Sequence, residues 1–231
     1  NTIGVPNFNV TLDEEGGMNY MLQEGFPRGI ANCIIEEAQR CPLRYFILDD
    51  SGSMSLSDGS RMVHAGSKYK VLKCSRWEEL TDTVAFHEGL SKAMNAPCEF
   101  RFLNQLAPMR TGCREVDPDD VKGRAVRKAL ESSPSGGTPL CYHVTEVVNS
   151  ITRSQNTLRQ NGQHVSVIIM ADGQASDGNL AEAMKPLAHL PCHVVIRLCT
   201  DQDDVVDYWN DVDQQLEVNL DILDDPIGEA I

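Results

Sequence analysis

The sequence has no run of apolar residues approaching the roughly 20 that a membrane-spanning helix needs, and no basic-then-apolar leader opens it. It also has no C-x-x-C pair, because its eight cysteines are scattered singly, which argues against a zinc or redox site. A chain of 231 residues does not need disulfides to fold. We therefore expect reduced thiols and an intracellular setting.

Positive charge is scarce, with 20 Lys and Arg against 34 Asp and Glu and a formal net charge of -14. This balance argues against a nucleic-acid backbone or an anionic membrane as the main partner and favours a bound cation. No Pro/Gly/Ser-rich linker divides the chain. We expect one domain over residues 43–231, preceded by an extension over residues 1–42 whose helix packs on it.

Hydrophobic patterning predicts the order of the elements. Wholly apolar segments indicate strands buried on both faces of a parallel sheet, at residues 45–48, 165–171 and 193–199. Helical spacing predicts helices at residues 27–39, 76–94, 117–129, 140–151 and 203–212. Further strands are expected at residues 98–103 and 216–222, with a β-hairpin insertion over residues 56–75. The pattern predicts an α/β fold with a doubly wound, mostly parallel central sheet of about six strands, one short antiparallel edge and flanking helices.

Oxygen-bearing side chains follow two of the buried strands and a glycine-rich loop. Asp49, Ser51 and Ser53 follow the first strand, Thr138 ends the loop, and Asp172 follows the strand at residues 165–171. Because the carboxyl ends of parallel strands share one edge of a sheet, we expect these side chains to converge. Their oxygens select Mg²⁺, Ca²⁺ or Mn²⁺ over zinc or copper. Two carboxylates cannot enclose such an ion, so a position stays open for an acidic partner.

These three pieces carry a resemblance. Residues 49–54, Asp-Asp-Ser-Gly-Ser-Met, resemble the D-x-S-x-S segment of von Willebrand factor A and integrin I domains. Residues 136–140 resemble the family's threonine loop, and residues 171–173 its distal aspartate turn. The resemblance covers about residues 43–222 and implies a Rossmann-like fold with a metal-ion-dependent adhesion site. Its implied ligands are Ser51, Ser53 and Thr138, with Asp49 and Asp172 binding the ion directly or through water.

The resemblance also implies a function and a rim around the ion. The function is a protein-binding module whose cation captures an Asp or Glu carboxylate of a partner. The expected rim consists of Asp50, Met54, Gly137, Gly173, Lys68 and Lys70. Asp50 departs from the family, which more often has an apolar or neutral residue there. The two lysines either steer an acidic ligand or form an ordinary solvated hairpin face.

Four other interpretations of these residues compete with the adhesion site. In one, Asp49 and Asp172 merely cap helices and the serines and glycines form turns, which explains each loop but not their convergence. In another, the acidic and serine cluster serves a metal-dependent hydrolase or phosphotransferase. A triad of Ser53 with Asp172 and a histidine (His143, His164 or His193) lacks the G-x-S-x-G elbow. A Walker loop lacks its G-K-[ST].

The end of the sequence suggests further domains. Asp225-Pro226 is typical of a helix start, so we expect the domain to belong to a larger multidomain protein or complex.

Overall fold

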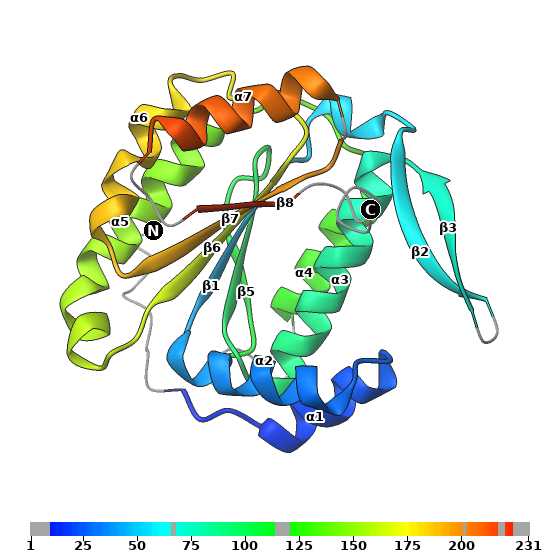
Figure 1. Ribbon diagram of the computed structural model, residues 1–231, viewed down its shortest axis with the longest axis vertical. Coiled ribbons are helices and arrows are strands. Elements are labelled where there is room, and N and C mark those ends of the chain that lie inside the picture. Colours follow the sequence, from blue (N-terminus) through cyan, green and yellow to red (C-terminus); the bar gives the residue numbers. More distant parts are fainter. Residues whose placement is uncertain (1–9, 66–67, 114–120, 201, 217–219, 224–231) are drawn as a thin grey trace.

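The computed structural model describes residues 10–65, 68–113, 121–200, 202–216 and 220–223 (Figure 1). Within these ranges lies a six-stranded sheet with the order β5-β4-β1-β6-β7-β8. Its parallel strands are β1 (Arg44–Leu48), β4 (Cys98–Phe102), β6 (Val165–Ala171), β7 (Cys192–Leu198) and β8 (Leu220–Leu223). The edge strand β5 (Met109–Thr111) pairs antiparallel with β4. The predicted α/β fold, with a mostly parallel sheet and one short antiparallel edge, is confirmed.

Helices cover both faces of this sheet. One face carries α5 (Leu140–Gln160), α6 (Leu180–Met184) and α7 (Asp203–Gln214), and the other carries α3 (Arg76–Met94) and α4 (Val121–Leu130) (Figure 1). In β1, Tyr45 and Ile47 pack into the core under α5, whereas Phe46 and Leu48 pack into the core under α3. A strand buried on both faces must be apolar throughout, which is the reason for the pattern seen in the sequence.

The connections leaving β1 and β6 run over opposite faces of the sheet. The chain passes from β1 through α3 to β4 on one side, and from β6 through α6 to β7 on the other. The two strands are direct neighbours, with Leu48 opposite Met170 at their carboxyl ends. Such a switch point leaves a crevice in which open α/β sheets bind ligands.

The N-terminal extension forms two helices, α1 (Glu14–Gln23) and α2 (Arg28–Arg40), where one was expected. Together with the end of α3 they bury a separate core cluster that includes Met21, Ile35 and Met94. The prediction for α2 is confirmed within one residue at each end. The sequence did not reveal α1, because its first turn contains Gly16 and Gly17, which disfavour an isolated helix.

The insertion after β1 is the predicted hairpin, with β2 (Gly59–Ala65) antiparallel to β3 (Lys68–Cys74). It forms a sheet of its own and extends away from the body of the molecule (Figure 1). Its base is tied to α3, because the Ser60 backbone N–H donates to Glu79 at 3.0 Å. The Glu79 carboxylate also pairs with Arg197 of β7 at 3.0 Å.

Several sequence-based predictions differ from the structure or lie beyond it. Of the edge strand expected at residues 216–222, the structure describes a strand only at β8, Leu220–Leu223. The expected helix starts at Asp117-Pro118 and Asp225-Pro226 lie outside the described residues. The short helix α6 was not predicted. None of the eight cysteines, all of which lie in the described ranges, forms a disulfide bond. Among the described residues, no helix combines the length and the apolar character needed to cross a membrane.

Candidate functional site

The loops that follow β1 and β6 meet at the switch point of the sheet. Asp49 comes directly after β1 and Asp172 directly after β6, and both side chains are buried. After Asp49 the chain turns into a short 3₁₀ helix, η1 (Gly52–Ser55), which brings Ser53 back over the strand ends. The expected convergence of the first and third loops is therefore found.

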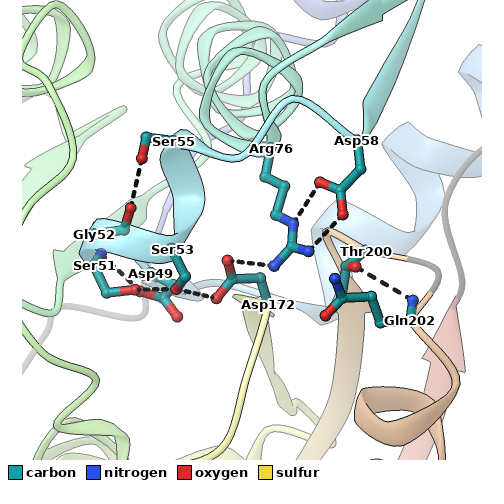
Figure 2. A network of polar contacts seen from close by, with 10 residues as sticks. All are labelled: Asp49, Ser51, Gly52, Ser53, Ser55, Asp58, Arg76, Asp172, Thr200 and Gln202. Atoms are coloured by element: carbon teal, nitrogen blue, oxygen red, sulfur yellow. Dashed lines mark hydrogen bonds and ion pairs between the residues drawn. The ribbon is translucent and has the colours of Figure 1, made fainter.

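A continuous chain of hydrogen bonds links four of the five expected ligands (Figure 2). The Ser51 backbone N–H donates to Asp49 Oδ1 at 2.8 Å. The hydroxyls of Ser51 and Ser53 are 3.0 Å apart, and the Ser53 hydroxyl donates to Asp172 Oδ1 at 2.9 Å. Each of these four residues is thus linked to the next by one hydrogen bond, and the last bond joins residues 119 positions apart.

One oxygen of this group has no partner. Asp49 Oδ2 is buried and accepts no hydrogen bond from the described residues. Burial raises the pKa of Asp49 to about 6, against the hydrogen bonds from Ser51 that favour its charged form. A buried, unsatisfied carboxylate oxygen is costly, and a cation bound beside it would remove that cost.

The threonine loop lies against the same edge, but through its backbone. The Gly52 N–H donates to the Gly136 carbonyl oxygen at 3.3 Å. The Thr138 N–H donates to the Ser176 hydroxyl at 3.1 Å, and its carbonyl oxygen accepts from the Ser176 N–H at 2.9 Å. Within the described structure no hydrogen bond joins the Thr138 side chain to Ser51 or Ser53. The loop is adjacent to the site, and Thr138 is half-exposed.

Asp50 was expected at the rim, and the structure corrects this. Its side chain is only 6% exposed, and its Oδ1 accepts from both the backbone N–H and the side-chain amide of Asn104, each at 2.8 Å. The same Asn104 amide donates to the Gly137 carbonyl oxygen at 2.9 Å. Asp50 therefore joins the end of β4 to the glycine-rich loop. A Cβ at Gly136, where φ is 105°, would lie 2.3 Å from Asn104 Oδ1, so this tight approach requires glycine.

Met54 was also expected at the rim but is fully buried in the core under α3. The turn of η1 points it inward, because an apolar side chain here fills the space between β1 and α3. Gly137 is exposed and Gly173 half-exposed, in positions that suit a rim.

The two rim lysines lie along the hairpin. The register pairs Lys68 with Ala65 and Lys70 with Val63, whereas Gly59 pairs with Cys74 at the base of the hairpin. At about 3.3 Å per residue, Lys68 lies roughly 20 Å along the hairpin from this base. The expected place of these lysines next to the ion is not supported.

The sequence did not reveal Arg76, which has the most direct contact with the site. Its guanidinium is 2% exposed and its Nη1 lies 2.9 Å from Asp172 Oδ2 (Figure 2). The same group donates to both oxygens of Asp58, from Nε at 2.7 Å and from Nη2 at 2.5 Å. These hydrogen bonds outweigh the effect of burial and raise the pKa of Arg76, and they lower the pKa of Asp58. No local signal predicts a pairing between residues 96 positions apart.

The donors that meet here fit a hard cation. They are carboxylate and hydroxyl oxygens, which Mg²⁺, Ca²⁺ and Mn²⁺ prefer, and the unpartnered Asp49 Oδ2 is the atom that a cation would satisfy. Among the described residues no three His, Cys, Asp or Glu side chains gather into a metal-binding group. The candidate site differs from such a group because it combines only two carboxylates with serine hydroxyls.

The sequence matches no family model and no curated protein. Among solved structures, the SpRpn10 VWA domain aligns with 80% of this chain and 87% of its own length, at 12% identity and a TM-score of 0.44. BatB, a conserved hypothetical protein from Bacteroides thetaiotaomicron, aligns with 81% and 92%, at 15% identity and a TM-score of 0.47. At these identities and scores the likeness supports no inference about function.

Proposed function

We propose that this chain is a von Willebrand factor A-like binding module, which holds one divalent cation at the ends of β1 and β6 and through it captures a carboxylate of a protein partner. The observation that carries the proposal is the buried Asp49 Oδ2, which has no partner among the described residues, whereas Oδ1 of the same carboxylate begins the hydrogen-bonded chain through Ser51 and Ser53 to Asp172. A group this costly is retained where it serves a ligand.

Each residue has a definite part in the proposal. Asp49 and Asp172 provide the negative charge, and Ser51 and Ser53 provide neutral oxygens between them. Thr138 provides a further hydroxyl from the loop that Asn104 and Ser176 hold in place. When bound, Mg²⁺, Ca²⁺ or Mn²⁺ would supply a positive centre with an open position for an oxygen of the partner. A protein with a net charge of -14 needs such a centre to attract an acidic ligand.

The alternative function is a metal-dependent hydrolase or phosphotransferase. It needs a general base within reach of the reacting hydroxyl. His164 precedes β6 and His193 is the second residue of β7. Both lie at the strand ends opposite Asp172, roughly 20 Å away at about 3.3 Å per residue. His143 is buried, and its Nε2 contacts the carbonyl oxygen of Leu103 at 3.1 Å. This arrangement favours the binding module.

Metal binding is tested first, by isothermal titration of the purified chain with Mn²⁺ and Mg²⁺. We expect one cation per chain, with affinity reduced at least tenfold in Ser53→Ala, because that variant removes the hydroxyl between Ser51 and Asp172. Ser55→Ala is the matched control, since the Ser55 hydroxyl donates only to the Gly52 carbonyl oxygen in the same 3₁₀ helix. Equal affinities for the two variants would contradict the proposed site.

Partner capture is tested next, by a pulldown from native extract in Mg²⁺, in chelator, and in Mg²⁺ with Thr138→Ala. We expect partners that the wild-type chain and a control variant capture in Mg²⁺ and that are absent in chelator or with Thr138→Ala. Thr145→Ala is the control, because this hydroxyl donates within α5 to the Cys141 carbonyl oxygen. The same partners under all conditions would exclude capture through the ion, and turnover of model esters or phosphates that Ser53→Ala abolishes would favour the enzyme.

A further inference from the structure

Arg76 is a positive charge built into the candidate site. Its side chain is 2% exposed and lies between Asp58, on the loop before the hairpin, and Asp172, after β6 (Figure 2). The two hydrogen bonds to Asp58 use Nε and Nη2, which leaves Nη1 directed at Asp172. A guanidinium held by two carboxylates cannot turn away without leaving one of them unpaired. It also keeps its proton at any physiological pH.

The guanidinium changes the charge balance of the site. Asp49 and Asp172 together carry two negative charges, which would balance the two positive charges of a divalent cation. Both oxygens of Asp172 already have partners, Ser53 on Oδ1 and Arg76 on Oδ2. Part of the charge of Asp172 is therefore compensated within the protein, and Arg76 repels a cation that approaches the same carboxylate. Because the group is buried, solvent screens this repulsion only weakly.

We propose that Arg76, anchored by Asp58, is a positioning residue that lowers the affinity of the site for its divalent cation by compensating the charge of Asp172. This inference rests on the proposed function, because it assumes that a cation binds there. It has a consequence for how the module works. A weakly held ion exchanges readily, and the site with its ion retains net positive charge. A partner's carboxylate supplies the missing negative charge, so the cation and the partner each bind more tightly when the other is bound.

A structural role for Arg76 makes a different prediction. If Arg76 only ties the hairpin base to β6, its replacement lowers stability and distorts the site, so cation binding becomes weaker. If Arg76 compensates Asp172, the same replacement makes cation binding stronger.

The test is isothermal titration of the full chain with Mn²⁺, comparing the wild type with Arg76→Gln. We expect the affinity of Arg76→Gln to rise at least tenfold, because glutamine removes the positive charge that faces Asp172. Arg61→Gln is the matched control, since Arg61 of β2 forms a solvent-exposed ion pair with Asp82 of α3 at 3.3 Å. Its affinity should stay within about threefold of the wild type. An unchanged or reduced affinity in Arg76→Gln would overturn the proposal.

A second pair of variants covers the case in which Arg76→Gln does not fold. Asp58→Asn is compared with the double variant Asp58→Asn and Arg76→Gln, in which two amides replace the ion pair and leave no unpaired charge at residue 58. The double variant should bind Mn²⁺ at least tenfold more tightly than Asp58→Asn alone. If Arg76→Gln unfolds the chain in both backgrounds, by circular dichroism, Arg76 belongs to the fold and the proposal is wrong.

The two proposals fail in different ways. If the wild type and every folded variant leave Mn²⁺ unbound, the proposed metal site is wrong, and the inference falls with it. If the wild type binds Mn²⁺ and Arg76→Gln binds it no more tightly, the metal site stands and only the role of Arg76 is refuted.

Discussion

Asp49 and Asp50 are adjacent buried carboxylates with opposite surroundings. Asp50 Oδ1 accepts two hydrogen bonds from Asn104, whereas Asp49 Oδ2 accepts none from the described residues. Burial raises the pKa of Asp49 to about 6, so its ionised form destabilises the ion-free protein at neutral pH. Two residues that look alike in the sequence therefore contribute to stability with opposite signs.

This contrast predicts opposite effects of the same substitution at pH 7.5 in chelator. Asp49→Asn should raise the free energy of unfolding by about 1 to 2 kcal/mol, because a neutral amide costs less to bury than a carboxylate. Asp50→Asn should lower it by about 1 kcal/mol, because bonds to a charged acceptor become weaker. Urea denaturation checks both values. A loss of stability in Asp49→Asn would show that Asp49 is a structural residue.

His87 in α3 is a second residue whose environment opposes charge. Its ring lies 5.0 Å from that of Phe46 and 5.3 Å from that of Phe86, measured between centroids. Desolvation lowers the pKa of His87 to about 4, and the nearby positive charges of Arg44 and Arg197 contribute to the decrease. The folded chain therefore keeps this histidine neutral at a pH where the unfolded chain protonates it.

Stability should consequently depend on pH through His87. Between pH 6.5 and 4 the unfolded state binds a proton at His87 that the folded state does not bind. The free energy of unfolding is therefore unaffected by His87 above about pH 6.5 and falls as the pH decreases towards 4. Phenylalanine cannot be protonated, so the free energy of unfolding of the wild type should fall by about 2 to 3 kcal/mol more than that of His87→Phe across this interval. Denaturation curves at pH 7 and pH 4.5 measure the difference, and parallel losses in the two proteins would contradict it.

At the scale of elements, the contact between α1 and α3 depends on the absence of side chains. A Cβ at Gly16 would lie 2.3 Å from the Ala93 carbonyl oxygen, and one at Gly17 would lie 2.6 Å from the sulfur of Met94. The backbone of Ala93 cannot move aside as a flexible side chain can. The two glycines therefore weaken α1 as an isolated helix and allow it to pack closely in the folded protein.

Two glycine substitutions test this packing. Gly16→Ala should lower the free energy of unfolding by about 1 to 3 kcal/mol, because the new methyl group separates α1 from α3. Gly29→Ala is the control in α2, where nothing lies within 4 Å of the added Cβ, and it should raise stability by about 0.5 to 1 kcal/mol. The same urea measurements apply. A Gly16→Ala variant as stable as the wild type would mean that α1 is not tightly packed.

At the scale of the whole molecule, a bound cation would couple the site to the stability of the chain. The site joins β1, β6 and the base of the hairpin, which meet only in the folded state. A ligand that binds only the folded protein at about 100 times its Kd adds roughly 2.7 kcal/mol. The net charge of -14 also attracts cations without specificity, so ionic strength must be matched with NaCl.

We therefore predict that saturating Mg²⁺ raises the Tm of the wild-type chain by about 5 to 10 °C relative to chelator at equal ionic strength. Asp172→Asn should show no more than a small shift, because it loses one of the two carboxylates of the site. Differential scanning calorimetry gives both values. Equal shifts in the two proteins would indicate general charge screening rather than a site.

The sequence by itself determined most of the elements and their order, because these depend on local signals, but it did not reveal α1, α6 or the edge strand β5. Helix α3 runs over residues 76–94 as expected, since Ser75 and Glu78 form a capping box at its start and Asn95, with φ of 50°, ends it. The buried strands were visible as apolar runs. The meeting of the loops after β1 and β6 also followed, because neighbouring parallel strands end at one edge.

Only the tertiary structure decided what each side chain at that edge contacts. In the folded protein Met54 packs into the core, Asp50 accepts hydrogen bonds from Asn104, and Arg76 pairs with Asp172. These choices depend on packing and charge pairing between residues up to 96 positions apart, and no local pattern encodes such a distance. Periodicity and turn residues act over a few positions, whereas the partner of a buried charge is chosen among all the groups that the fold brings within reach.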